Sequence, residues 1–191
     1  MKKTIRTPII GGLIFGALSY LTTMADLTIQ VSQDLILGPW EIFNTLSAAL
    51  FGPIGMLITE LGLDISGYVY LIRGVYPAPQ DAYFMIGNYI AHIVGLFFVA
   101  FGYRYLHQRT GIWGLLAGWV LVMGIYYIVG ITLTVPLHNI AVPGLGASYT
   151  GYFSNVRVEF VLVCVITALI LLALPEHYRR PRWHEPKPST D

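Results

Sequence analysis

Long apolar runs alternate with short polar segments along the chain, in lengths that are typical of transmembrane helices. The runs predict six helices, at residues 8–25, 39–51, 54–71, 84–105, 112–135 and 156–174. Gly52 and Pro53 separate the second helix from the third, because proline cannot continue a helix but suits its first position. The second helix would span only about 20 Å of a hydrocarbon core of about 30 Å. We therefore expect the segment before it to extend it or to enter the protein.

The polar segments between these runs predict loops. Residues 26–37 and 73–83 are mixed or turn-rich, and residues 136–154 form a long stretch rich in Gly and Pro that we expect to act as a lid. Residues 177–191 predict a polar cytoplasmic tail without regular structure. The expected organisation is a single six-helix transmembrane domain over residues 1–176, followed by this tail.

Composition supports a membrane protein. The chain is 55% hydrophobic and 11% charged, whereas a soluble domain carries about 25% charge. The single cysteine, Cys164, excludes an internal disulfide and a metal site built from cysteines. A net charge of +1 without a basic stripe argues against nucleic acid as a partner. We expect neither a bound metal nor a cofactor.

The first apolar run has two interpretations. A basic start followed by Thr23, Met24 and Ala25 is compatible with a cleaved signal peptide. We favour an uncleaved helix, because Gly12 and Gly16 form a GxxxG pair that permits close contact between membrane helices.

Basic residues predict the orientation. With six helices and both termini cytoplasmic, nine basic residues fall inside and two fall outside, in agreement with the positive-inside rule. Fusing the second and third helices into one crossing would place one terminus on the wrong side. The inside residues are Lys2, Lys3, Arg6, Arg104, Arg109, Arg179, Arg180, Arg182 and Lys187, and the outside residues are Arg73 and Arg157.

Polar side chains gather in the outer halves of the predicted helices. Glu60 and Asp64 are spaced i and i+4 and share a helix face, as do Asn88 and His92. Ionisable groups at this depth are expensive in lipid, so we expect them to face an outward-facing pocket for a small solute. The candidate substrate-binding residues are Glu41, Asn44, Glu60, Asp64, Asn88, His92, Tyr126, Tyr127, Asn155 and Glu159.

Each candidate also has a simpler interpretation. Tyr126 and Tyr127 could belong to an aromatic belt, and His92 could be a hydrogen-bonded core residue. Four charged residues could lie at the headgroup level or pair with each other, namely Glu41, Arg73, Arg157 and Glu159.

Glu60 is the hardest candidate to explain without a function. At mid-depth it must be protonated, paired with Arg157 or His92, or held for a cationic or hydrogen-bond-donating substrate. Because Asp64 lies one turn away, we expect at least one of the two acids to be neutral in an empty pocket. A positively charged ring in the ligand would relieve both.

No pattern indicates an enzyme. The HExxH, GxSxG and Walker A motifs are all missing from the sequence, so no spacing selects a reaction and the chain cannot use ATP by itself.

The stretch LSAALFGPIG at residues 46–55, followed by Glu60 and Asp64, resembles the substrate-binding S component of energy-coupling factor (ECF) vitamin transporters. The resemblance implies six helices in the cytoplasmic membrane and binding of a vitamin or vitamin precursor under the outer loops. It also implies a transmembrane coupling subunit and ATPase subunits as partners, contacted through small residues of the first helix, here Gly12 and Gly16. Cell-shape proteins of the MreD type share a similar layout. The alternative is therefore a membrane scaffold without a small-molecule ligand.

Overall fold

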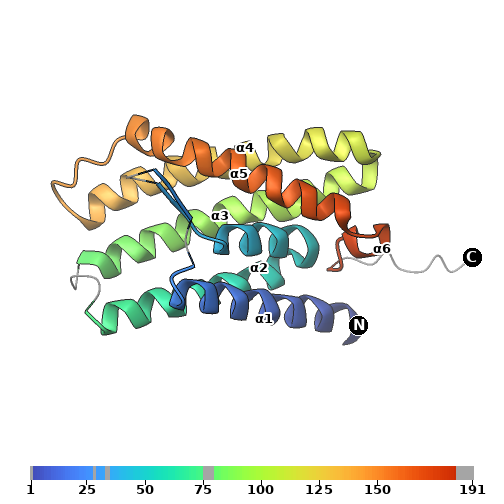
Figure 1. Ribbon diagram of the computed structural model, residues 1–191, viewed down its shortest axis with the longest axis horizontal. Helices are drawn as coiled ribbons and strands as arrows, with labels where there is room; N and C mark the ends of the chain where they lie inside the picture. The colour runs from blue at the N-terminus through green and yellow to red at the C-terminus, as the bar shows by residue number, and fades with distance from the viewer. Residues whose placement is uncertain (1, 28, 33–34, 75–79, 184–191) are drawn as a thin grey trace, which may run out of the picture.

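The computed structural model describes the backbone of residues 2–27, 29–32, 35–74 and 80–183, and the side chains of this part except at residues 2–5, 29–37, 80–85 and 155. Within it the chain is a helical bundle with one small hairpin (Figure 1). The elements are α1 (Lys2–Met24), β1 (Ile29–Ser32), β2 (Leu35–Leu37), α2 (Trp40–Ile72), α3 (Gln80–Arg109), α4 (Ile112–Ala141), α5 (Tyr149–Ala173) and α6 (Glu176–Arg179). The strands pair antiparallel with Ile29 opposite Leu37, so part of the predicted loop at residues 26–37 is a β-hairpin.

The helix α2 reverses direction at Gly52. This residue has φ 66° and ψ −158°, a conformation that is almost restricted to glycine. Pro53 follows at the start of the second arm, where its missing N–H costs little. Figure 1 shows the two arms, residues 40–51 and 53–72, running in opposite directions. The predicted break at Gly52 and Pro53 is confirmed.

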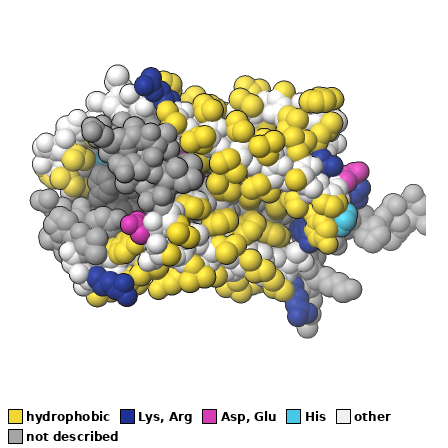
Figure 2. Space-filling view, in the orientation of Figure 1, with side chains coloured by type: hydrophobic (Ala, Val, Ile, Leu, Met, Phe, Trp, Pro, Cys, Tyr) yellow, Lys and Arg dark blue, Asp and Glu magenta, His cyan; other side chains and the backbone are white. Residues whose placement is uncertain are grey.

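Five helices in the described part of the chain are long and apolar enough to cross a membrane, with the two arms of α2 counted together. They are Arg6–Met24, Trp40–Ile72, Ile86–Arg109, Ile112–Ala141 and Val156–Ala173. Hydrophobic side chains cover most of the visible face of the bundle, and Lys and Arg lie toward its ends (Figure 2). These features are those of a multi-pass membrane protein.

Glycines bring α1 close to the second arm of α2. A Cβ atom at Gly12 would lie 2.7 Å from the carbonyl oxygen of Gly55, and one at Gly16 would lie 2.9 Å from that of Ile58. The hydroxyl oxygen of Thr59 lies within hydrogen-bonding distance of Gly12 O, at 3.3 Å, and of Ser47 Oγ, at 2.7 Å. Both glycines of the GxxxG pair thus make a close helix contact inside this chain.

The predicted loop at residues 136–154 is largely helical, so its length was overestimated. The helix α4 continues through Pro136 to Ala141, and α5 begins at Tyr149, which leaves only residues 142–148 between them. Asn139 holds this short connection by exchanging two hydrogen bonds of 2.9 Å with the backbone of Ala147. Ser148 caps α5 by accepting a hydrogen bond from Gly151 N.

The first part of the predicted tail is structured. Residues 176–179 form α6, and Tyr103 Oη donates a hydrogen bond of 2.9 Å to Arg179 O. Arg182 N donates to Leu50 O at 2.8 Å, and the ring of Trp183 packs edge-on against Phe101, 5.4 Å between centroids. The expectation of a tail without regular structure is therefore wrong up to Trp183, and residues 184–191 lie outside the described part.

Candidate functional site

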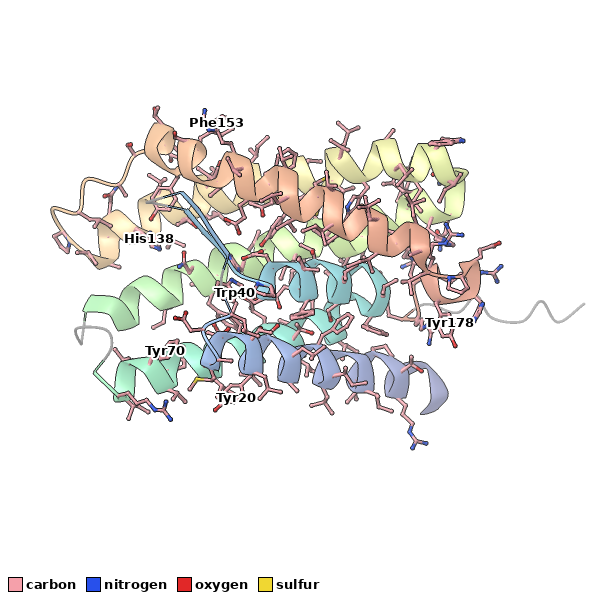
Figure 3. All side chains as sticks on the ribbon, in the orientation of Figure 1. Tyr20, Trp40, Tyr70, His138, Phe153 and Tyr178 are labelled. Carbon is pink, nitrogen blue, oxygen red and sulfur yellow. The ribbon has the colours of Figure 1, made fainter. Side chains whose placement is uncertain are left out.

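A cavity of about 110 Å³ lies between α2, α3, α4 and α5. The cavity lies in the half of the bundle where α2 begins, because its lining residue Glu41 belongs to the first turn of α2. Figure 3 shows this half, with Trp40 and His138 lying away from Tyr178 and α6. The lining residues are Glu41, Asn88, His92, Tyr126, Tyr127, Gly130, Ile131, Thr134, Tyr152, Val156 and Glu159.

The ring of His92 stands between two buried carboxylates. Its Nδ1 lies 3.2 Å from Glu60 Oε1, and its Nε2 lies 3.4 Å from Glu41 Oε1. Both ring nitrogens are donors only in the protonated imidazole, so this geometry fits a positively charged His92. The positive ring would offset part of the cost of holding two carboxylates inside the bundle.

The other oxygens of these carboxylates have neutral hydrogen-bond donors. Asn44 Nδ2 donates to Glu60 Oε2 at 2.5 Å, and Tyr126 Oη donates to Glu41 Oε2 at 2.7 Å. A continuous chain of contacts therefore runs from Tyr126 through both acids and His92 to Asn44. Three members of this series of contacts line the cavity, namely Tyr126, Glu41 and His92. The other two, Glu60 and Asn44, lie behind His92 and do not line it.

Two lining groups lack such partners. Glu159 makes no hydrogen bond and no ion pair with any described residue. The hydroxyl of Tyr127 is buried and also has no hydrogen-bond partner in the described part of the chain. Its ring is held by edge-on contacts with Tyr126 and Phe160, 5.0 and 5.5 Å between centroids. The cavity therefore offers a carboxylate and a hydroxyl whose hydrogen-bonding capacity no described residue uses.

Tyr152 closes part of the cavity through a contact that joins α4 to α5. Its hydroxyl hydrogen-bonds with Nδ1 of His138, which is 1% exposed. Burial raises the pKa of the Tyr152 phenol, so the hydroxyl stays protonated. Sequence reasoning missed this pair because Gly and Pro around it indicated a loop. The helical i, i+3 spacing of Val135 and His138 was the available signal.

The structure gathers most of the predicted site residues. Those that line the cavity or join the chain of contacts are Glu41, Asn44, Glu60, Asn88, His92, Tyr126, Tyr127 and Glu159. Asp64 is half-buried one turn beyond Glu60 and does not line the cavity. Asn155 belongs to α5, but its side chain lies outside the described part. The lining residues that were not predicted are Gly130, Ile131, Thr134, Tyr152 and Val156.

The predicted partner residues lie elsewhere. Gly12 and Gly16 are buried against α2, whereas Leu13, Ile14 and Leu21 form the exposed side of α1. The partner contact through the glycines stays a prediction, and α2 already covers them within this chain.

The chemistry of the cavity is acidic and aromatic. No Lys or Arg is among its described lining residues, and no cluster of His, Cys, Asp or Glu in the described part of the chain has the arrangement of a metal site. Comparison with family models, curated proteins and solved structures gives no match to this chain.

Proposed function

We propose that this chain is the substrate-binding S component of an ECF-type importer, which captures a vitamin or vitamin precursor from outside the cytoplasmic membrane. Partner subunits, a transmembrane coupling protein and ATPases, would supply the energy, because the sequence carries no nucleotide-binding motif. The observation that carries the proposal is a polar cavity inside an apolar helical bundle, with polar groups from four helices around it. Convergent polar groups in a cavity are the usual sign of a small-molecule site.

The proposed topology has six crossings with both termini in the cytoplasm. The start of α1 and α6 lie at one end of the bundle, and the hairpin and residues 142–148 lie at the other (Figure 1). The first arm of α2 spans only about 18 Å, so the hairpin next to α5 would complete that crossing. The cavity then opens toward the outside, which suits capture of a solute from there.

A membrane scaffold is the competing function, and the cavity separates the two. A scaffold has no need to hold Glu41, His92 and Glu159 around an internal space at a cost in stability. The exposed apolar side of α1 is the surface we propose for the coupling subunit, since the glycine side already faces α2.

Native mass spectrometry of the purified protein tests the proposal. Gly130 lines the cavity and a Cβ there meets open space, so Gly130→Leu should fill the cavity. Gly124, on the same helix, is equally open but does not line the cavity, so Gly124→Leu is the matched control. We expect a co-purifying metabolite with the wild type and with Gly124→Leu, and none with Gly130→Leu. A chain without adduct after exposure to every cell extract would instead favour the scaffold.

A further inference from the structure

We infer that the ligand of this cavity is a small organic cation, and that Glu159 binds its positively charged nitrogen. The inference rests on the proposed function, because it assigns the chemical class of the solute that the cavity would capture.

The balance of charges around the cavity is the first argument. Glu41, Glu159 and, behind His92, Glu60 bring three carboxylates to a site that holds a single His and no described Lys or Arg. The one positive charge that His92 can carry is shared between Glu41 and Glu60 at 3.4 and 3.2 Å. Glu159 makes no ion pair with a described residue, and although it lies in the field of His92, the charge of His92 already serves two closer carboxylates. A carboxylate without an ion pair inside a membrane bundle is costly. A cationic ligand would supply the missing charge.

The unused hydrogen-bonding groups are the second argument. Glu41 is occupied by Tyr126 and His92, whereas the buried hydroxyl of Tyr127 has no hydrogen-bond partner in the described part of the chain. Glu159 and Tyr127 can therefore both accept hydrogen bonds from a ligand N–H.

The aromatic lining is the third argument. Three tyrosines, Tyr126, Tyr127 and Tyr152, line the same cavity. Tyrosine faces attract organic cations, and burial of the site strengthens that attraction because little water competes. Amide, hydroxyl and aliphatic groups of Asn88, Thr134 and Ile131 complete the wall without adding charge.

The size of the cavity limits the ligand. An apolar cavity of about 150 Å³ accommodates benzene. The cavity here, at about 110 Å³, suits an alkylammonium or amidinium group, or a single-ring cation after small side-chain adjustments.

Paired cations and neutral isosteres test the inference directly. The probes are acetamidine, benzamidine and choline, compared with acetamide, benzamide and 3,3-dimethyl-1-butanol, and binding is measured by calorimetry on the full chain in detergent. We expect at least one cation to bind about tenfold or more tightly than its neutral isostere, as for a charged hydrogen bond gained. Glu159→Gln should remove that preference, whereas Glu176→Gln, at an exposed position on α6, should keep it. If Glu159→Gln fails to fold, the wild-type comparison of each pair still decides the result.

The metabolite found by native mass spectrometry separates this inference from the proposed function. A cationic metabolite that is lost in Glu159→Gln supports both. A neutral or anionic metabolite that fills the cavity overturns the inference and leaves the proposed function standing. If there is no metabolite and no response to any probe, the proposed function fails and the inference fails with it.

Discussion

Tyr126 on α4 donates a hydrogen bond of 2.7 Å to Glu41 on α2, although the two residues lie 85 positions apart in the chain. Both side chains are buried, so this contact ties the first arm of α2 to the wall of the cavity. It also gives a polar partner to a carboxylate that would otherwise depend on His92 alone. The same hydrogen bond thus supports the fold and shapes the site.

Tyr126→Phe removes this hydroxyl and keeps the ring. We expect a loss of about 1.5–3 kcal/mol in the free energy of unfolding, as for a hydrogen bond to a charged group. Denaturant titration in detergent measures the loss. The control is Tyr68→Phe, because Tyr68 is exposed and makes no hydrogen bond with a described residue, so its removal should change stability little. Equal effects of the two substitutions would show that the Tyr126–Glu41 hydrogen bond contributes nothing to stability.

Glu60→Gln separates a structural role from a ligand-binding one. Glu60 accepts a hydrogen bond from Asn44 and pairs with His92, and it lies behind the cavity wall. We expect the substitution to cost roughly 1.5–3 kcal/mol of stability and to weaken ligand binding less than Glu159→Gln does. Asp64→Asn, one turn further along the same arm, is the control, and it should not lower stability because it removes a like charge near Glu60. Normal stability together with lost binding in Glu60→Gln would place Glu60 in direct contact with the ligand.

Cysteine labelling tests the topology. In a Cys164→Ser background, Ser148→Cys between α4 and α5 and Glu176→Cys on α6 occupy exposed positions at opposite ends of the bundle (Figure 1). A membrane-impermeant maleimide added to intact cells should label the first and not the second, and lysis should expose the second. Labelling of both in intact cells would exclude the proposed six-crossing topology.

Local backbone chemistry explains why part of the fold could be predicted. The break at Gly52 and Pro53 follows from what these two residues permit, whatever surrounds them. The gathering of Glu41, Glu60 and His92 was predictable for a different reason, since isolated ionisable groups are expensive in lipid and must find one another.

The predictions from sequence are wrong where tertiary contacts outweigh the local composition of the chain. Pro136 and the glycines after it indicated a loop, yet α4 continues through Pro136 because a membrane helix tolerates a proline when neighbouring groups replace the lost hydrogen bond. The position of Glu60 behind His92 also escaped prediction. Sequence spacing fixes depth along a helix but not which neighbouring helix covers each of its faces. The docking of Trp183 depends in the same way on a distant partner, the turn at Gly52.

That turn gives the last prediction. Gly52 has a positive φ that strains any residue with a Cβ, and the Cβ would also meet the indole ring of Trp183. Gly52→Ala should therefore carry two costs, a backbone strain of about 1–3 kcal/mol and a steric cost that Trp183→Ala removes.

A double-mutant cycle, measured as free energies of unfolding in detergent, separates these costs. In the Trp183→Ala background, Gly52→Ala should lower the free energy of unfolding by the backbone strain alone. In the native background, the same substitution should lower it by the backbone strain and the steric cost together. Gly74→Ala is the matched control, because Gly74 has a similar φ of 70° with open space around it, so its cost should be the same in both backgrounds.

Because the first arm of α2 ends at this turn and begins beside Glu41, the strained variant should also weaken ligand binding at the opposite end of the arm. If Gly52→Ala lowers the free energy of unfolding equally with and without Trp183, the indole makes no steric contact with the turn. The C-terminal segment would then not stabilise the first arm of α2.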